Sequence, residues 1–349
     1  AIRVPWFEAE MADYNAEMDR KCLALMREYG LTAFSSPLGI RMKGKGRDLA
    51  LDFSQADRTM AQARDAGMHL VVCYGVAVYG LNVYGYPTPT DPKRYGFGQL
   101  GELFKHVFGL VDQHAREAEW LPIVITACDE PVDANLAKSA ANAALLKACS
   151  SERVRFAGAT SMRQGREPDK NPHLPLVREL DIANYNSHDV WSIGKARESG
   201  SWAFYNGGNR WTYGFYMFML RQKYGMAFRL SWHWNCNAGD PYYALDCRED
   251  DYAWVNANRK GELVRAIHVE RLREGVDDYR HLLTLKRLVE RTPDHADAPT
   301  ARKILGDVLS LVPHEDRGSA AIWATDTQGA YLRKTRYEIA GLINRLGGK

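Results

Sequence analysis

Helical and strand-like segments alternate along most of this 349-residue chain. An amphipathic helical stretch is followed by a short break and then by a run of apolar, β-favouring residues, and this unit occurs seven times. Such alternation predicts an α/β fold in which helices cover a parallel sheet. The expected strands are residues 31–35, 69–74, 122–127, 154–159, 181–185, 202–206 and 227–234.

The number of these units favours a (β/α)8 TIM barrel over a doubly wound sheet. A doubly wound sheet normally carries a glycine-rich phosphate loop, and neither GxGxxG nor GxxxxGK[ST] occurs here. Seven units fit an eight-stranded barrel whose first strand is poorly defined, either at residues 2–6 or upstream of the chain. We expect a catalytic barrel over residues 1–295 and a helical extension, packed on it, over residues 296–349. The rest of the surplus over a typical barrel of about 250 residues lies in the loops 79–95 and 235–259.

The charge balance and the hydropathy exclude two classes of protein. Lys and Arg number 46 against 43 Asp and Glu, which gives a net charge of +3 and no basic footprint for nucleic acid. No apolar stretch reaches the roughly 18 residues that a membrane-spanning helix needs. The chain begins at Ala1 without a Met or a leader-like segment, so we expect a removed leader or a piece of a longer protein.

The six cysteines are too sparse for a disulfide framework. Cys73 and Cys128 fall inside apolar strand-like runs, which predicts buried thiols. Cys236 and Cys247 share one long loop and are the pair that is placed for a bridge. No zinc-ligand spacing occurs, so we expect neither a metal nor another cofactor.

Asp129 and Glu130 follow the apolar run of residues 123–126, with Ala127 and Cys128 between the run and the two acids. A barrel carries its chemistry at the carboxyl ends of its strands, where these two acids stand side by side. Neighbouring carboxylates disfavour each other's ionisation, so a partly dry site would give a general acid beside a persistent anion. The alternative is structural: Asp129 or Asp133 caps the helix that begins near Asn135.

The adjacency of the two acids limits the mechanism. Carboxylates on successive strand residues point to different sides, whereas a two-carboxylate glycosidase needs a pair that flanks one sugar ring. The pair instead suits a mechanism in which the 2-acetamido oxygen of the substrate attacks C1. Asp129 would orient that acetamide, and Glu130 would protonate the leaving oxygen. Asp189 and Asp240 are the other acids placed to serve as a conventional second carboxylate.

Aromatic residues are numerous, with 9 Trp and 18 Tyr, and they cluster between residues 202 and 254. Rings at a concave surface suit the flat, apolar faces of sugars, while amides and imidazoles bond sugar hydroxyls. The alternative is that these rings fill a large core. The candidate substrate-binding residues at strand ends are Tyr74, Tyr185, Asn186, His188, Tyr205, Asn206, Trp232, His233 and Trp234.

Two motifs resemble glycoside hydrolase family 123 and related uncharacterised barrels. The first is Asp129-Glu130-Pro131 after a hydrophobic strand, and the second is the segment 270–279, which is similar to the E-x-x-R-E-G-x-x-D-Y helix that closes those barrels. The resemblance implies a β-N-acetylgalactosaminidase-like retaining hydrolase, extracellular or periplasmic, that forms an oxazoline-like intermediate. It also implies that Asp129 orients the acetamide and that Glu130 is the acid/base.

Four charged residues of the second motif share one helix face by their i, i+3, i+4, i+7 spacing: Glu270, Arg273, Glu274 and Asp277. We expect this stripe to be a structural ion-pair network.

The sequence therefore predicts a hydrolase that removes β-linked N-acetylhexosamine from a carbohydrate substrate, with GalNAc preferred over GlcNAc. Two alternatives stay open. One is a glycosidase for a non-acetamido sugar, which uses Glu130 with Asp189 or Asp240. The other is a non-catalytic barrel that binds glycans or a partner protein through its aromatic mouth.

Overall fold

The computed structural model describes residues 8–162, 168–204, 212–231, 234, 254–258, 260, 262–311 and 326–348. The helices are α1 (Glu8–Glu28), α2 (Ser54–Asp65), α3 (Leu100–Glu117), α4 (Ala134–Lys147), α5 (Leu174–Arg178), α6 (Val190–Ser199), α7 (Met217–Tyr224), α8 (Ile267–Arg291), α9 (Ala298–Leu309) and α10 (Asp326–Leu346). The strands are β1 (Ala33–Ser35), β2 (Ile40–Lys43), β3 (Ala50–Asp52), β4 (Leu70–Cys73), β5 (Val78–Tyr79), β6 (Ile123–Asp129), β7 (Val154–Ser161), β8 (Ile182–Ser187), β9 (Ser201–Phe204), β10 (Val255–Ala257) and β11 (Leu263–Arg265).

The chain forms two compact units. The predicted boundary at residue 295 falls inside one of them, between α8 and α9. The sheet unit comprises Arg20–Asn186 and Val190–Ala203, and the C-terminal unit comprises Ala1–Asp19, Ser187–Asp189 and Phe204–Lys349.

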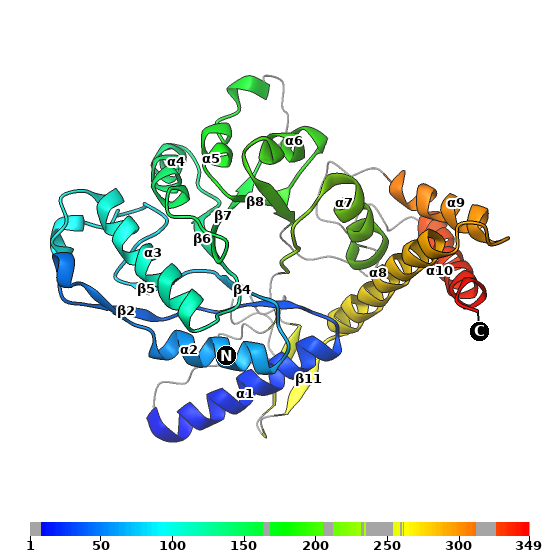
Figure 1. Cartoon of the computed structure of the whole chain (residues 1–349), viewed down its shortest axis with the longest axis horizontal. Coiled ribbons are helices and arrows are strands. Elements are labelled where there is room, and N and C mark those ends of the chain that lie inside the picture. Colours follow the sequence, from blue (N-terminus) through cyan, green and yellow to red (C-terminus); the bar gives the residue numbers. More distant parts are fainter. Residues whose placement is uncertain are drawn as a thin grey trace. The chain divides into compact units, whose positions relative to one another are not determined.

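A six-stranded sheet, in the order β1-β4-β6-β7-β8-β9, organises the sheet unit (Figure 1). β1 pairs with β4, β4 with β6 and β6 with β7, and all three pairs are parallel. Their registers are Ser35↔Val72, Val72↔Val124 and Ile125↔Phe156. Each of the six strands overlaps a predicted one. The prediction of an α/β fold with a parallel sheet is therefore confirmed.

The described residues show this six-stranded part of a barrel and no closed eight-stranded one. The predicted first strand, residues 2–6, lies outside them. The strand predicted at 227–234 is not formed at residues 227–231, where Arg229 makes an isolated bridge. The Arg229 guanidinium instead lies 4.1 Å from the centre of the Tyr213 ring, and the Tyr213 hydroxyl lies 3.0 Å from Ser231 Oγ. Side-chain contacts thus replace the strand ladder that the apolar pattern predicted.

Helices α2 to α6 lie on the outer side of the sheet (Figure 1). In α3 the buried residues recur at helical spacing, so one face of the helix is apolar. Phe108 of that face packs edge-on against Phe156 of β7, with the ring centres 5.0 Å apart. A capping box fixes the start of α3, since the Gln99 main-chain N–H donates to the Glu102 carboxylate at 3.1 Å. The buried residues of α3 are Leu103, Phe104, Val107, Phe108, Val111 and Ala115.

A second, three-stranded sheet has the order β3-β2-β5. β2 is antiparallel to β3 and parallel to β5. β2 and β3 follow β1 in the chain, and β5 follows β4 and leads into the loop 79–95. This small sheet therefore anchors the start of that loop.

In the C-terminal unit, α8, α9 and α10 pack against one another (Figure 1). α8 contains the whole segment 270–279. On this helix Arg273 binds the carboxylates of Glu270 and Asp277, each at 3.1 Å. The predicted ion pairs are therefore confirmed for Glu270, Arg273 and Asp277, three of the four residues of the stripe. A separate ion pair joins α8 to α10, because Arg336 Nε lies 2.7 Å from the fully buried carboxylate of Asp278.

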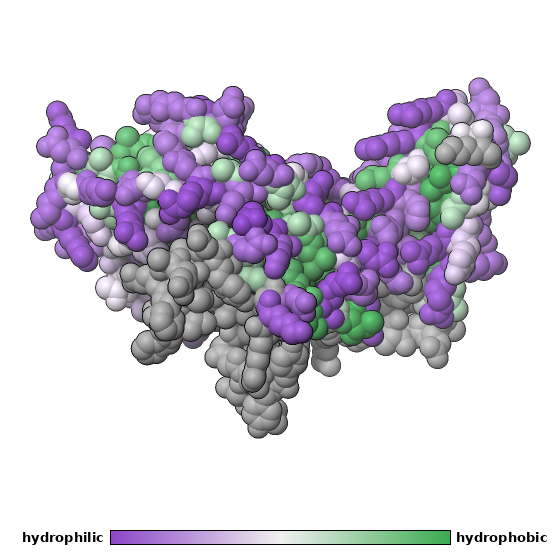
Figure 2. Space-filling view, turned by 90° about the horizontal axis from the view of Figure 1, so that it is seen from below, coloured by the Kyte–Doolittle hydropathy of each residue, from purple (hydrophilic) through white to green (hydrophobic). Residues whose placement is uncertain are grey.

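Many of the aromatic residues fill the interiors of the two units. Trp202 of β9 is fully buried, and Phe215, Phe218 and Trp254 are buried in the C-terminal unit. For these rings the core alternative holds. The surface that Figure 2 shows is mainly hydrophilic, with smaller apolar areas between the polar residues. Among the helices that the structure describes, none has an apolar stretch long enough to cross a bilayer.

Candidate active site

Asp129 is the last residue of β6, and Glu130 directly follows the strand. A β-bulge between Thr126 and Cys128 shifts the register with β7, so that Asp129 pairs with Ala159. A bulge of this kind re-aims the side chains that follow it. Glu130 then has a φ of +42°, in the left-handed region that L residues rarely adopt. Such conformations cost about 1–3 kcal/mol and cluster at functional sites, so this turn supports a functional role for the pair.

Asp133 is a second strained residue, with a φ of +49°. It occupies the N-cap position of α4, yet its side chain makes no capping hydrogen bond. In the described part of the chain, the hydrogen bonds of Asp129 are those of its main chain. Neither acid therefore caps α4, and the structural alternative does not explain the pair.

A tyrosine from the loop 79–95 binds the main chain of Asp129. The Tyr86 hydroxyl donates to the Asp129 carbonyl oxygen at 2.6 Å and accepts the Asp129 N–H at 3.2 Å. β4 ends at Cys73, which pairs with Ile125, so β6 continues beyond this neighbour. The Tyr86 hydroxyl supplies the hydrogen bonds that a neighbouring strand would otherwise supply.

Tyr84 and Tyr86 lie together beside Asp129, with their ring centres 5.8 Å apart. Burial raises the pKa of Tyr84, and the negative charge of Asp129 raises it further. Burial also raises the pKa of Tyr86, against the opposite effect of its hydrogen bond to the Asp129 main chain. Both hydroxyls therefore stay protonated at neutral pH and can donate hydrogen bonds.

Glu130 is exposed, and the side-chain amide of Asn186 donates to its carboxylate. Asn186 lies at the carboxyl end of β8, and β7 separates β8 from β6 in the sheet. The structure thus brings together two of the predicted site residues. An exposed carboxylate held by a neutral amide is able to exchange a proton with a bound substrate.

Tyr185, next to Asn186, points to the other face of β8. It is fully buried, and its hydroxyl donates to the main-chain oxygen of Ser192 in α6 at 2.9 Å. Successive side chains alternate between the faces of a strand, so Asn186 reaches Glu130 while Tyr185 faces the helix layer. The structure therefore does not place Tyr185 in the wall of a subsite.

The remaining predicted residues fall in different places. Tyr74 directly follows β4 and is half-buried. His188 and Asp189 belong to the C-terminal unit and are buried, with His188 Nε2 3.5 Å from the Tyr216 hydroxyl. Trp234 of the same unit is half-buried. The predictions for Tyr205, Asn206, Trp232, His233, Asp240, Cys236 and Cys247 lie outside the described residues.

Tyr84 and Tyr86 are not among the site residues that the sequence predicts, because their loop counts as surplus length over a typical barrel. The available signal is a group of tyrosines among Gly, Asn and Pro residues directly after a strand. The Asn82 side-chain amide donates to the Tyr86 oxygen at 2.9 Å, and its oxygen accepts the Tyr84 N–H at 3.0 Å. Asn142 of α4 donates to the Val83 oxygen. The loop is thus an ordered part of the site.

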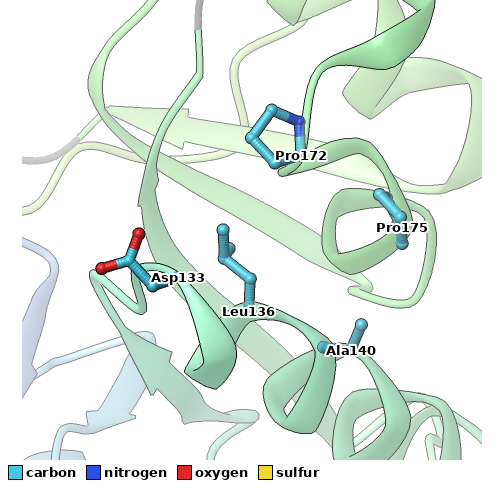
Figure 3. Close-up of a pocket in the computed structure, with 6 residues that line it drawn as sticks. Asp133, Leu136, Ala140, Pro172 and Pro175 are labelled. Atoms are coloured by element: carbon cyan, nitrogen blue, oxygen red, sulfur yellow. The ribbon is translucent and has the colours of Figure 1, made fainter.

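A groove of about 480 Å³ opens beside the N-terminal end of α4. In Figure 3, Leu136 and Ala140 of α4 lie across the groove from Pro172 and Pro175, with Asp133 at one end. The walls are largely apolar, and none of the predicted substrate-binding residues that the structure describes lines them.

A histidine lies at the carboxyl end of β7, between β6 and β8. His173 Nδ1 is 2.6 Å from the hydroxyl of the buried Thr160. Burial lowers the pKa of His173, so the imidazole is neutral at pH 7. In the described part of the chain, no three His, Cys, Asp or Glu side chains converge in the manner of a metal site.

No family model matches the chain, and no curated protein matches it. Among solved structures, a family 123 glycoside hydrolase from Clostridium perfringens, described for glycolipid glycan hydrolysis, has a TM-score of 0.59 and 12% sequence identity over 95% of this chain. The two folds are similar. The expected resemblance to family 123 is thus confirmed for the fold. This chain spans 65% of the length of that hydrolase.

Two further structures are more distant. A glycosyl hydrolase family 2 member from Bacteroides cellulosilyticus has a TM-score of 0.36 and 11% identity, covering 62% of this chain and 25% of its own. An endo-β-N-acetylglucosaminidase from Cordyceps militaris has a TM-score of 0.34 and 8% identity, covering 74% of this chain and 83% of its own.

Proposed function

We propose that this protein is a glycoside hydrolase that removes β-linked N-acetylhexosamine, with GalNAc preferred, by a retaining, substrate-assisted mechanism. The observation that carries the proposal is the Asp129-Glu130 pair at the carboxyl end of β6, which follows a β-bulge, turns at the left-handed Glu130 and is unused as a helix cap. The similar fold of a family 123 glycoside hydrolase supports it. In this proposal the six-stranded sheet belongs to an eight-stranded barrel.

In the first step, the acetamide oxygen of the substrate attacks C1 while the bond to the leaving oxygen breaks. Glu130 gives its proton to that oxygen, and Asp129 accepts the acetamide N–H and stabilises the charge of the oxazoline-like intermediate. In the second step, water attacks C1 while the bond between C1 and the acetamide oxygen breaks, and the water passes a proton to Glu130; the acid and the acetamide are thereby restored. The exposed position of Glu130 suits proton transfer to both a leaving group and water.

The natural substrate is proposed from the fold neighbour. Because that neighbour is described for glycolipid glycan hydrolysis, glycolipid glycans are the first candidates for this chain, and the proposed mechanism requires that they end in β-linked N-acetylhexosamine.

Turnover of nitrophenyl β-GalNAc and β-GlcNAc by three variants tests the proposal. We expect Glu130→Gln and Asp129→Asn to lower kcat/KM by roughly 100-fold or more, since general acid catalysis contributes about 10²–10⁴-fold. Asp133→Asn is the matched control, because Asp133 belongs to the same strained turn and has no role in the mechanism. Its activity should stay within about threefold of wild type. Undiminished activity in either of the first two variants contradicts the proposal.

A thiazoline analogue of GalNAc separates this mechanism from the alternative with Asp189 or Asp240. The analogue mimics the cyclised intermediate, so tight competitive inhibition is expected for the acetamide route. Absence of inhibition, together with turnover of a non-acetamido glycoside, would favour the alternative.

A further inference from the structure

We infer that Tyr86 is a positioning residue for the acidic pair: its hydroxyl fixes the main chain of Asp129 and thereby directs the side chains of Asp129 and Glu130. The inference rests on the proposed function and adds to it a residue that touches neither the substrate nor the reacting atoms.

The Tyr86 hydroxyl binds the peptide groups on both sides of Asp129. It accepts the Asp129 N–H at 3.2 Å and donates to the Asp129 carbonyl oxygen at 2.6 Å. On the opposite side, the Glu130 N–H donates to the Ala159 oxygen of β7 at 3.0 Å. The peptide group between the two acids is therefore held at its oxygen by Tyr86 and at its nitrogen by the sheet.

This peptide group directly precedes the left-handed main chain of Glu130, with its φ of +42°. Without hydrogen bonds on both sides, rotation of the peptide plane would let Glu130 relax toward the ordinary β or α region. The carboxylate would then leave the position in which Asn186 binds it. The hydroxyl thus stabilises the conformation on which both acids depend.

Hydrogen bonds and packing against α4 fix the loop that carries Tyr86. The Tyr86 main-chain oxygen accepts the Asn82 amide at 2.9 Å, and Asn142 of α4 binds the neighbouring Val83. A Cβ at Gly85 would lie 2.8 Å from Asn142 Cβ, so the loop lies directly against α4. α4 in turn packs on β6 and β7. The position of the hydroxyl is therefore set by the fold and does not depend on a bound substrate.

Tyr86→Phe tests this role, because it keeps the ring and removes the hydroxyl. We expect kcat to fall about 10–100-fold with KM changed less than about threefold, since a small misplacement of reacting groups costs rate more than ground-state binding. Inhibition by the GalNAc thiazoline should weaken about 10-fold or more, because it depends on Asp129 in its catalytic orientation.

Tyr95→Phe is the matched control. The Tyr95 hydroxyl donates to the Gly80 oxygen at 2.9 Å, so this variant removes a tyrosine hydroxyl bond from the same loop without altering the contacts of Asp129. Its kcat should stay within about twofold of wild type. Hydrogen exchange of a peptide containing the Asp129 and Glu130 amides adds a readout without activity, and we expect faster exchange in Tyr86→Phe than in Tyr95→Phe.

The kinetics of the variants distinguish the positioning role of Tyr86 from the proposed function. An inactive Asp129→Asn beside a Tyr86→Phe variant with normal kcat and normal exchange overturns the positioning role alone. A fully active Asp129→Asn overturns the proposed function and the positioning role with it. A fall in both kcat and KM by the same factor, or a loss of stability without a change in kcat, also contradicts the positioning role.

Discussion

The side-chain amide of Asn186 donates to the carboxylate of Glu130, and this bond joins the ends of β8 and β6 across β7. Hydrogen bonds to charged groups are about twice as strong as those between neutral groups, and they also fix direction. A carboxyl group that must reach a leaving oxygen and later a water molecule gains from a fixed direction. We therefore expect Asn186 to orient the carboxyl group of Glu130 in the proposed site.

Replacing Asn186 by Ala should lower kcat/KM for nitrophenyl β-GalNAc by roughly 10-fold or more, because a hydrogen bond to a charged group contributes about 1.5–3 kcal/mol. Gln113→Ala is the control, since the Gln113 amide donates to the Glu117 carboxylate at 2.8 Å on the exposed face of α3. That variant removes the same type of bond and should leave kcat/KM unchanged. Equal activities of the two variants would show that the Asn186 bond has no part in catalysis.

The cysteines give a prediction that is independent of the proposed function. Cys73 and Cys128 are fully buried, as predicted from their strand positions, and burial raises the pKa of Cys73 to about 12 and raises that of Cys128 as well. At pH 8 nearly all Cys73 thiols are then protonated, whereas the thiolate is the reactive form. We expect iodoacetamide to modify the half-buried Cys149 first of these three. Peptide mass spectrometry, with and without urea, measures the extent of modification at each cysteine.

Urea should make Cys73 and Cys128 react, because the unfolded thiols recover an ordinary pKa near 8.5. The protection is greatest at neutral pH and decreases as the pH rises toward the raised pKa. Modification of Cys73 in the folded protein at the rate of Cys149 would contradict this account.

The central strand β6 could be predicted from the sequence because it is buried on both faces. Ile123, Val124 and Ile125 are apolar, and these three residues and the following Thr126 are all buried in β6. The same pattern failed at residues 227–231, where Arg229 and Ser231 interrupt the run and bind Tyr213. Two polar side chains with a specific partner thus outweigh local β propensity.

The site could be predicted only in part. Asp129 and Glu130 stand out as adjacent acids after an apolar strand, but alternation does not tell which of Tyr185 and Asn186 faces the acids. The bulge in β6 also has no signal in the apolar pattern, since every residue around it is buried. The Tyr86 contact joins residues 43 positions apart, and hydrophobic periodicity carries no information on such pairs.

Substitution of Gly85 and of Gly225 by Ala separates two destabilising effects of a side chain: a strained main-chain conformation and a steric overlap. Both have positive φ, +75° and +68°, and so an L residue costs roughly 1 kcal/mol at each. A Cβ at Gly225 meets open space, whereas a Cβ at Gly85 overlaps Asn142. Gly225→Ala should therefore lower the free energy of unfolding by about 1 kcal/mol, and Gly85→Ala by about 2–4 kcal/mol.

Urea unfolding measures both variants, and the kinetics of Gly85→Ala give a second readout. Since Gly85 precedes Tyr86 in the loop, we expect its substitution to lower kcat as well, while Gly225→Ala leaves kcat unchanged. Equal destabilisation by the two substitutions would mean that the loop does not lie against α4 as the contacts indicate.

Among the described ion pairs of the C-terminal helices, we expect loss of the pair between Arg336 of α10 and Asp278 of α8 to lower the free energy of unfolding most. The Asp278 carboxylate is fully buried and the Arg336 side chain is 26% exposed, with 2.7 Å between Nε and Oδ1. Removing one partner of such a pair leaves an uncompensated buried charge, so Arg336→Ala should lower the free energy of unfolding by about 3 kcal/mol. Lys303→Ala is the control, because Lys303 pairs with Asp307 at 2.8 Å but is 75% exposed, and exposed pairs contribute about 0–1 kcal/mol.

A double-mutant cycle with Asp278→Ala and Arg336→Ala, measured by urea unfolding, should give a coupling of at least about 1 kcal/mol. Additive effects in that cycle, or equal losses from Arg336→Ala and Lys303→Ala, would contradict the role of this pair in joining α8 to α10.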